Sequence, residues 1–286
     1  MALEMSRGPL TDTPEFWADE FSEVYGERDL TRDLLQTWAM AVENATKVAT
    51  SIRKRAYADS ARELTHVFCW VVSFVNKLKR DPSVPARFKN SEFTSISDMV
   101  WYKYPQTCPL CLNRTCSCPL LRQYPSKEQI NAALEKGRSS ETRPQTLRQW
   151  QTMFSNIYEA AQGTMTVPEI GFHFFEEIGE VQRSIRDIAI LPEEQVSELA
   201  ELQKNMYMEI ADTISWTFAL LQKFSSEIQR FRPLLGDKFE EPLLFLDQLL
   251  YKEFHDPSTK RIRCPRCGNR PCSCTTRRMG ITRGTI

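Results

Sequence analysis

The hydrophobic residues between His173 and Leu191 recur at intervals of three and four positions. The apolar stripe consists of Phe174, Ile178, Val181, Ile185 and Ile188. Side chains at this spacing lie on one face of an α-helix, so we expect an amphipathic helix here. Polar residues occupy the neighbouring face at a similar spacing: Glu177, Glu180, Ser184 and Asp187.

The next segment repeats the helical period. Its stripe consists of Leu199, Leu202, Met206, Ile210 and Ile214. Pro192 is expected in the first turn, where its missing N–H costs nothing, and Glu193 and Glu194 favour the positive end of the helix dipole. Glu209 and Asp212 share one side of this helix because they lie one turn apart. A third helix is expected from about residue 242 to residue 252.

Strand patterns are nearly absent, so the predicted fold class is all-α, built as helical bundles. The composition agrees, because ten glycines in 286 residues are few and glycine weakens helices. A hydrophobic fraction of 41% and a charged fraction of 26% are typical of a globular chain rather than a disordered one.

Charge and hydropathy exclude several classes of function. The formal net charge is zero, so no whole-molecule field points to nucleic acid. The end of the chain is an exception, because only basic charges occur from Lys260 onward: Lys260, Arg261, Arg263, Arg266, Arg270, Arg277, Arg278 and Arg283. The longest apolar run, residues 67–75, is too short to span a bilayer. The first residues contain no apolar signal segment, so we expect a cytoplasmic protein that does not enter a membrane.

Eight of the nine cysteines form two clusters with identical spacing. Both clusters read C-P-x-C-x-N-R-x-C-S-C, and their members are Cys108, Cys111, Cys116 and Cys118, and Cys264, Cys267, Cys272 and Cys274. Four thiolates in two close pairs are typical of a structural zinc site, and the reducing cytosol disfavours disulfides. We therefore predict two structural Zn²⁺ ions. The ninth, Cys69, lies among apolar neighbours and is predicted to be a core residue.

The duplicated clusters suggest a duplicated chain. Three upstream segments match in the same order: residues 48–53 with 181–186, residues 63–70 with 209–216, and residues 98–103 with 247–252. We predict a first repeat with its zinc knuckle at 1–118, a linker at 119–146, a second repeat with its knuckle at 147–274 and a basic tail at 275–286. Within the linker, Ser126 and Gln129 form a capping box for one short helix that Gly137 ends.

The candidate chemistry lies in two acidic pairs, Glu177 with Glu180 and Glu209 with Asp212. Two packed antiparallel helices would bring these four carboxylates together, and their repulsion is relieved by a cation. Carboxylate oxygens suit Mg²⁺ or Mn²⁺, and Mg²⁺ commonly binds substrate phosphates. Acidic residues on exposed helix faces are often only solvated, so the pattern alone leaves that alternative open.

The sequence from Phe175 to Val181, followed by residues 209–212, resembles the E-E-x-x-E and E-x-x-D signature of MazG-like pyrophosphohydrolases. The connection between the two pairs is at the long end of that family's range, and the zinc knuckles are not part of its pattern. The resemblance implies tandem helical bundle units that form a pseudo-dimer. It also implies Mg²⁺-dependent cleavage of a nucleoside triphosphate, ribo or deoxy, to the monophosphate and pyrophosphate.

By this resemblance the catalytic metal ligands would be Glu177, Glu180, Glu209 and Asp212. Glu176 would assist, and Lys252 on the third helix would contact the substrate phosphates. The first repeat departs from the signature, because the matching residues are Glu43, Asn44, Lys47, Glu63 and His66. A lysine at a ligand position repels a cation, so we predict that the first repeat is inactive and serves as a built-in partner for the second.

Two alternatives use the same fold. One is a nucleotide sensor with little or no hydrolysis, and the other is a nucleic-acid-binding protein that uses the knuckles and the basic tail. We favour neither over the hydrolase, and the sequence leaves the preferred base, the sugar and a homo-oligomeric state open. No P-loop or G-x-G-x-x-G motif is present, so phosphate binding has to rest on metal ions and side chains.

Overall fold

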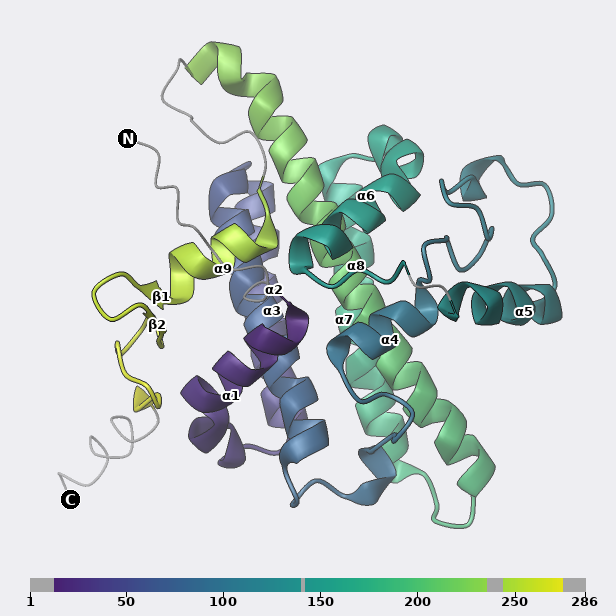
Figure 1. Cartoon of the computed structure of the whole chain (residues 1–286), viewed down its shortest axis with the longest axis horizontal. Coiled ribbons are helices and arrows are strands. Elements are labelled where there is room, and N and C mark those ends of the chain that lie inside the picture. Colours follow the sequence, from purple (N-terminus) through teal and green to yellow (C-terminus); the bar gives the residue numbers. More distant parts are fainter. Residues whose placement is uncertain (1–12, 140–141, 236–243, 275–286) are drawn as a thin grey trace.

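The structure is a computed structural model that describes residues 13–139, 142–235 and 244–274. Within these residues the chain is mostly helical, as predicted (Figure 1). The α-helices are α1 (Pro14–Leu30), α2 (Leu34–Arg53), α3 (Tyr57–Arg80), α4 (Ile96–Lys103), α5 (Lys127–Arg138), α6 (Leu147–Thr164), α7 (Val167–Ile190), α8 (Val196–Leu235) and α9 (Leu246–Phe254). Short 3₁₀ turns occur at Ala86–Phe88 and Cys118–Leu120.

Four α-helices precede a cysteine cluster on either side of α5. Helices α1 to α4 lead to the first cysteine cluster, and α6 to α9 lead to the second. The first helix of each series begins at a threonine N-cap, Thr13 or Thr146, whose side chain accepts an N–H from the first turn. A fully buried tryptophan follows at the same place, Trp17 or Trp150. We refer to residues 13–118 as the first half and residues 147–274 as the second half.

Two helical hairpins form the centre of the molecule. Helix α2 packs along α3 and helix α7 packs along α8, with short connections that make each pair antiparallel. The hairpins pack on each other through α2 against α7 and α3 against α8. The indole N–H of Trp38 on α2 donates to the carbonyl oxygen of Ile178 on α7 at 2.9 Å. This contact joins the two halves at a fully buried position.

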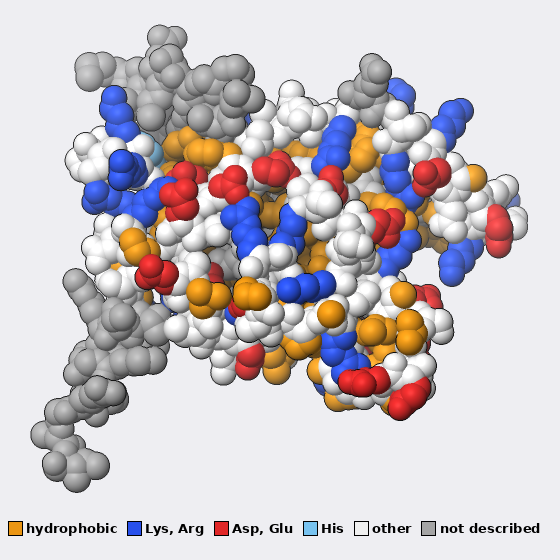
Figure 2. All heavy atoms as spheres, turned by 60° about the horizontal axis from the view of Figure 1, so that its bottom comes forward, with side chains coloured by type: hydrophobic (Ala, Val, Ile, Leu, Met, Phe, Trp, Pro, Cys, Tyr) orange, Lys and Arg blue, Asp and Glu red, His pale blue; other side chains and the backbone are white. Residues whose placement is uncertain are grey.

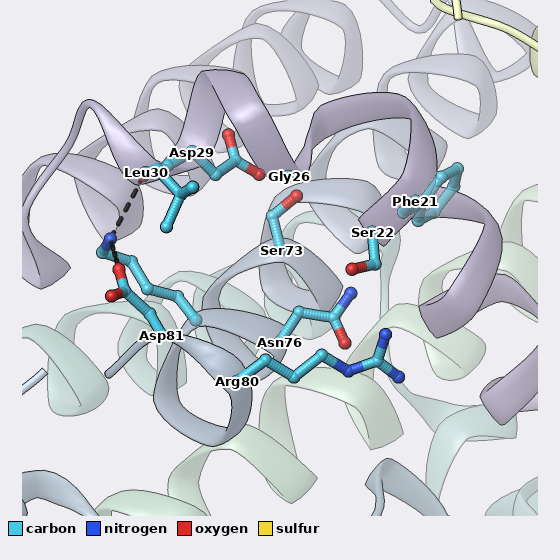
Figure 3. Close-up of a pocket in the computed structure, with 10 residues that line it drawn as sticks. Phe21, Ser22, Gly26, Asp29, Leu30, Ser73, Asn76, Arg80 and Asp81 are labelled. Carbon is cyan, nitrogen blue, oxygen red and sulfur yellow. Dashed lines mark hydrogen bonds and ion pairs between the residues drawn. The ribbon is translucent and has the colours of Figure 1, made fainter. Parts of the chain in front are cut away.

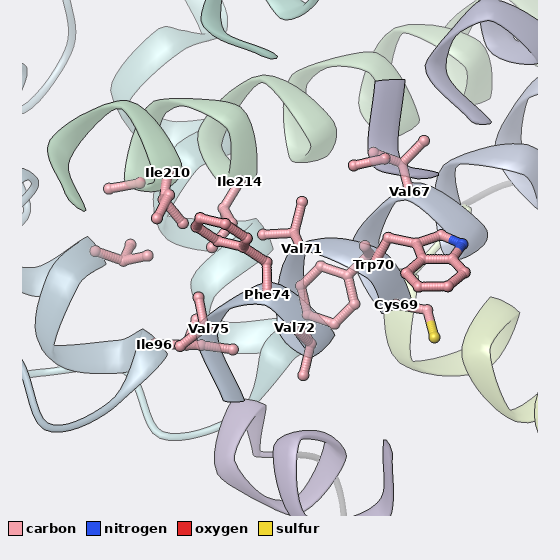
Figure 4. Packing of buried hydrophobic residues seen from close by; sticks show 14 of the residues in the cluster. Val67, Cys69, Trp70, Val71, Val72, Phe74, Val75, Ile96, Ile210 and Ile214 are labelled. Atoms are coloured by element: carbon pink, nitrogen blue, oxygen red, sulfur yellow. The ribbon is translucent and has the colours of Figure 1, made fainter. Parts of the chain in front are cut away.

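Helix α3 is buried on several sides, which explains its uninterrupted apolar run. Figure 4 shows Val71 and Val75 on the side of α3 that faces Ile210 and Ile214 of α8. Trp70 lies on another side of the helix, away from α8. A helix that is apolar around its circumference must be covered on all sides, and here α1, α2, α8 and α9 provide that cover.

The short helices cross from one half to the other. Helix α4 belongs to the first half and packs against α8, whereas α9 belongs to the second half and packs against α3. The cysteine clusters cross in the same way. The N–H of Cys116 donates to the carbonyl of Ile157 on α6, and the N–H of Cys272 donates to the carbonyl of Val24 on α1. Each half is therefore completed by elements of the other.

The predicted helix of the 173–191 segment is confirmed, and all five residues of its stripe are buried. The start of the next helix was predicted too early. Pro192 lies in a turn, and α8 begins only at Val196. The third helix begins at Leu246 instead of residue 242, which lies outside the described residues, and it continues to Phe254.

The linker helix is α5, and the predicted capping box of Ser126 and Gln129 is present. Gly137 does not end this helix as predicted, because α5 continues to Arg138. A Cβ atom on Gly137 would lie 2.9 Å from the ring of Pro105. The glycine therefore permits a close approach between α5 and the chain that follows α4.

Strand structure in the described residues is limited to β1 (His255–Asp256) and β2 (Arg261–Ile262), which pair antiparallel ahead of the second cysteine cluster. Cys69 is buried and unpaired, as predicted for a core residue. In the described part of the chain, no helix combines the length and hydrophobicity that crossing a bilayer requires. The predicted basic tail, residues 275–286, lies outside the described residues.

Candidate metal centre

The acidic residues predicted from the sequence lie on two packed antiparallel helices. Glu177 and Glu180 occupy α7, and Glu209 occupies α8. Carboxylate oxygens of these three residues all lie within 4.8 Å of one another. One cation could contact all three, because hard divalent cations bind carboxylate oxygens at about 2.0–2.6 Å.

Asp212, the fourth predicted acid, lies beside this group but has other partners. Its side chain is almost buried, with 8% of the residue exposed. One oxygen accepts the hydroxyl proton of Tyr104 at 2.5 Å, and the other forms an ion pair with Lys103. The Lys103 ammonium also lies 4.0 Å from Glu209. Asp212 is thus positioned by the end of α4, and it is outside the group of three converging oxygens.

Lys103 and Tyr104 were not predicted as site residues. The sequence comparison had matched Lys103 with Lys252, and the family resemblance pointed to Lys252. Helix α9, which carries Lys252, packs against α3 and α6, and Lys252 makes no contact with the four acids in the described part of the chain. Because α4 crosses between the halves, the lysine that reaches the acids is Lys103. The sequence repeat could show that the lysines correspond but not which acids each one faces.

Two of the acids, Glu177 and Glu209, hold protons more tightly than exposed carboxyls do. Burial, together with the negative charges of Asp212 and Glu209, raises the pKa of Glu177 to about 9 against the opposing charge of Lys103. Burial also raises the pKa of Glu209 above its usual range. One carboxylate oxygen of Glu177 is buried without a hydrogen-bond partner in the described residues. A bound cation would supply that missing partner.

At the exposed edge of the acidic cluster, Glu176 and Glu180 contact residues that do not belong to the cluster. Glu176 lies 3.3 Å from a ring nitrogen of His173, and it is not among the converging carboxylates. The His173 ring stacks on Trp216, with ring centroids 4.7 Å apart. Glu180 lies 3.7 Å from Arg183. This edge therefore combines an aromatic surface with exposed polar groups.

The two cysteine clusters have the geometry of tetrahedral zinc sites. The Sγ atoms of Cys108 and Cys118 are 3.6 Å apart, and those of Cys264 and Cys274 are 3.7 Å apart. A tetrahedron with Zn–S bonds of about 2.3 Å has S–S edges of about 3.8 Å. Within each cluster all four sulfurs lie within 4.8 Å of one another, and no disulfide forms among the described cysteines. These donors therefore fit Zn²⁺ as predicted, with every coordination position supplied by the protein.

The backbone folds in the same way around both clusters. The N–H of Leu112 donates to the carbonyl of Cys108 at 2.9 Å, and the N–H of Gly268 donates to Cys264 at 2.8 Å. Both turn residues have positive φ angles, 61° for Leu112 and 71° for Gly268. This conformation suits glycine and strains leucine. The second knuckle therefore has the sequence better suited to the turn.

The first knuckle lies close to the acidic residues of the second half. The N–H of Cys116 donates to the carbonyl of Ile157, and the next residue on α6 is Tyr158. Burial raises the pKa of Tyr158, and the nearby charges of Cys108 and Asp212 raise it further. The rings of Tyr104 and Tyr158 are neighbours, with centroids 6.3 Å apart. The aromatic side chains thus separate the zinc ligands from the carboxylates.

The corresponding positions of the first half do not form an acidic group. Lys47 donates to Asn44 at 3.1 Å and lies 3.6 Å from Glu43. His66, at the position of Asp212, lies 3.0 Å from Glu253 of α9. Among the described residues, these side chains do not belong to any group with metal-ligand spacing.

A small cavity between α1 and α3 has a structural explanation (Figure 3). Its volume is about 220 Å³. The buried ammonium of Lys77 donates to the carbonyl of Asp29 at 3.1 Å and to the carboxylate of Asp81. Hydrogen bonds from Lys77 and Ser83 lower the pKa of Asp81 to about 2. Because the buried charges at this cavity are paired with each other, they need no ligand to neutralise them.

No protein-family model, curated protein or solved structure matches this chain. The functional argument therefore rests on the residues and their geometry.

Proposed function

We propose that the protein hydrolyses nucleoside triphosphates to the monophosphate and pyrophosphate, using Mg²⁺ or Mn²⁺ held by the acidic residues of the second half. The convergence of Glu177, Glu180 and Glu209, with one buried Glu177 oxygen lacking a partner, carries this proposal. The sequence signature of MazG-like enzymes supports the choice of substrate. The protein would then be a tandem of two such units, arranged as a pseudo-dimer within one chain.

The bound cation would neutralise the phosphates and carboxylates during reaction. A water oxygen attacks the α-phosphorus, the bond from that phosphorus to the bridging oxygen breaks, and pyrophosphate leaves. A carboxylate of the cluster accepts the proton that the water releases. Lys103 would move from Asp212 to a substrate phosphate, since a cation between the acids takes over its neutralising role. The first half would thus supply a lysine to the active site of the second.

The test is pyrophosphate release from the four ribonucleoside and four deoxyribonucleoside triphosphates with Mg²⁺. Glu209→Gln should reduce turnover at least about a hundredfold, because loss of a metal ligand removes several kcal/mol of transition-state stabilisation. Glu63→Gln is the matched control, since Glu63 occupies the same position on α3. We expect it to retain activity within about twofold of wild type.

Equal effects of the two variants would contradict the assignment of the second half as the active site. Absence of turnover with all eight nucleotides would overturn the hydrolase proposal. Mg²⁺-dependent nucleotide binding without turnover would then identify a sensor that uses the same acids.

The nucleic-acid alternative gains little from the described residues. Arg270 at the second knuckle forms ion pairs with Glu20 and Glu23, and Arg263 pairs with Asp256 at 2.8 Å. On the face shown in Figure 2, basic and acidic side chains are interspersed. Single-strand binding commonly uses a continuous basic groove, and the described charges on this face do not form one.

A further inference from the structure

A large cavity occupies the place in the first half that corresponds to the acidic centre of the second. Its volume is about 550 Å³, and α1, α2, α3, α9 and the second knuckle contribute to its walls. The residues that match the predicted metal ligands all line it: Asn44, Lys47, Glu63 and His66. Ligand pockets commonly have volumes of about 300–1,000 Å³, so this cavity has the size of a ligand site.

The charge of this cavity is opposite to that of the acidic centre. At eight matched positions the cavity is lined by Arg28, Arg32, Glu43, Asn44, Lys47, Glu63, His66 and, from the second knuckle, Arg266. The matching residues in the sequence are Ala161, Met165, Glu176, Glu177, Glu180, Glu209, Asp212 and, from the first knuckle, Leu110. Four of the cavity residues are basic and two are acidic, whereas five of the matching residues are acidic and none is basic. Beside those acids lies Lys103 of α4. Each site adjoins a knuckle with four cysteines, so the charge of the cysteine ligands is the same at both.

Arg28 forms a fixed cationic part of the wall. Its guanidinium lies 4.0 Å from the ring centre of Tyr25 and 4.0 Å from that of Trp70. Its Nε donates to Asp29 at 2.7 Å, and its Nη2 lies 2.6 Å from the same carboxylate oxygen, so the guanidinium is ion-paired on one side. Stacking between two rings holds the planar group in one orientation, which reduces the entropy lost on binding an anion.

Two further cations reach the cavity from different elements. Lys47 on α2 is 49% exposed, and its contact with Glu43 at 3.6 Å is an exposed ion pair of little strength. Arg266 is exposed on the second knuckle. Trp70, Tyr25 and Phe254 contribute aromatic surface to the same cavity. Cations beside aromatic surface suit a ligand with both a phosphate and a ring.

We propose that this first-half cavity binds a phosphate-bearing molecule of nucleotide size without a metal ion. Arg28, Lys47 and Arg266 would contact the phosphate, and Trp70 would contribute to the apolar wall. The site differs from the proposed catalytic centre in both residues and chemistry. Its existence does not depend on hydrolysis by the second half.

Isothermal titration calorimetry of the full chain without divalent cations tests this site, with ATP, pyrophosphate and adenosine as probes. We expect ATP and pyrophosphate to bind and adenosine to bind at least tenfold more weakly. Lys47→Glu combined with Arg266→Leu gives the cavity the residues found at the matching positions of the sequence, Glu180 and Leu110. This double variant should weaken ATP binding at least tenfold, while Lys54→Glu, which repeats the charge change of Lys47→Glu at the end of α2 and outside the cavity, should stay within twofold of wild type.

Glu177→Gln locates the bound ligand. We expect it to leave metal-free ATP binding unchanged, because Glu177 lies in the other half. Binding that depends on Glu177 but not on Lys47 and Arg266 would overturn the proposal, as would the absence of metal-free binding by the wild type. Thermal unfolding of each variant checks the fold, and the exposure of Lys47 and Arg266 keeps the expected change in melting temperature small.

Discussion

The difference between the halves is concentrated in a few side chains, and Glu177 illustrates it best. Its counterpart Asn44 is a neutral amide that donates to the carbonyl of Met40 at 2.7 Å. Glu177 instead places a carboxylate among other acids, where its pKa rises to about 9. A carboxyl group of this kind holds a proton at neutral pH unless a cation takes the proton's place.

The raised pKa of Glu177 predicts how stability depends on pH without added Mg²⁺. The ordinary pKa of a glutamate is about 4.3, so the folded protein binds this proton more tightly than the unfolded chain does. The resulting stabilisation is complete below that ordinary value and is lost as pH rises toward 9. We expect the melting temperature to fall by a few degrees between pH 6 and pH 9, and added Mg²⁺ to raise it more at pH 8.5 than at pH 6.

Glu177→Gln is the control for this prediction, because an amide of similar size cannot titrate. The variant should show a smaller fall in melting temperature over the same pH range and a smaller response to Mg²⁺ at pH 8.5. If wild type and variant gave parallel curves with the same Mg²⁺ response, Glu177 would not be the group responsible.

At the scale of elements, the amphipathic helices could be predicted because their apolar residues follow the helical period. The stripe of α7 is fully buried, and Met206, Ile210 and Ile214 of α8 are buried as well. The start of α8 was predicted less well, because proline and glutamate favour a first helical turn but also fit the turn before it. The cysteine spacing predicted the local geometry of both clusters, since all four ligands lie within a few residues.

The partners of α4 could not be predicted from the sequence. Periodicity identifies the buried face of a helix but not the helix that covers it. The acidic pairs were predicted as a site because α7 and α8 are consecutive and antiparallel. Lys103 and Tyr104 reach Asp212 from far along the chain, and their own sequence contains no pattern that indicates this contact.

Each knuckle packs on a helix of the other half, so equivalent cysteine substitutions in the two knuckles should affect turnover unequally. Cys116→Ser and Cys272→Ser should each reduce bound zinc from two ions to one, measured by metal analysis. Cys116→Ser should also reduce pyrophosphate release by roughly tenfold, because the first knuckle and the adjoining end of α4 support Asp212, and such supporting contacts commonly matter by this factor.

Cys272→Ser should affect turnover less, since the second knuckle packs on α1 of the first half. Cys272→Ser should weaken metal-free ATP binding more than Cys116→Ser does, because the second knuckle lines the first-half cavity. The reverse order of the two effects on turnover would show that the first knuckle does not support the acidic centre.

At the scale of the whole molecule, the two halves exchange equivalent elements. Helix α4 packs on α8 and helix α9 packs on α3. Tyr104 bonds to Asp212, and Glu253 contacts His66 at the matching position of the other half. Apolar surface on α3 and α8 would be exposed if either half were removed. Domains with such large shared cores do not fold independently, unlike domains joined by a small polar interface.

This exchange predicts the behaviour of a chain divided in the linker between Arg122 and Gln123, two exposed residues. Each fragment alone should lack a cooperative thermal transition, because α8 loses α4 and α3 loses α9. The fragments expressed together should associate through these same surfaces, so that an affinity tag on one recovers both in equal amounts. Pyrophosphate release should return only in the associated pair, since Lys103 and the four acids then lie on different fragments. A second fragment that folded alone and turned over substrate at the wild-type rate would show that the first half is dispensable for the acidic centre.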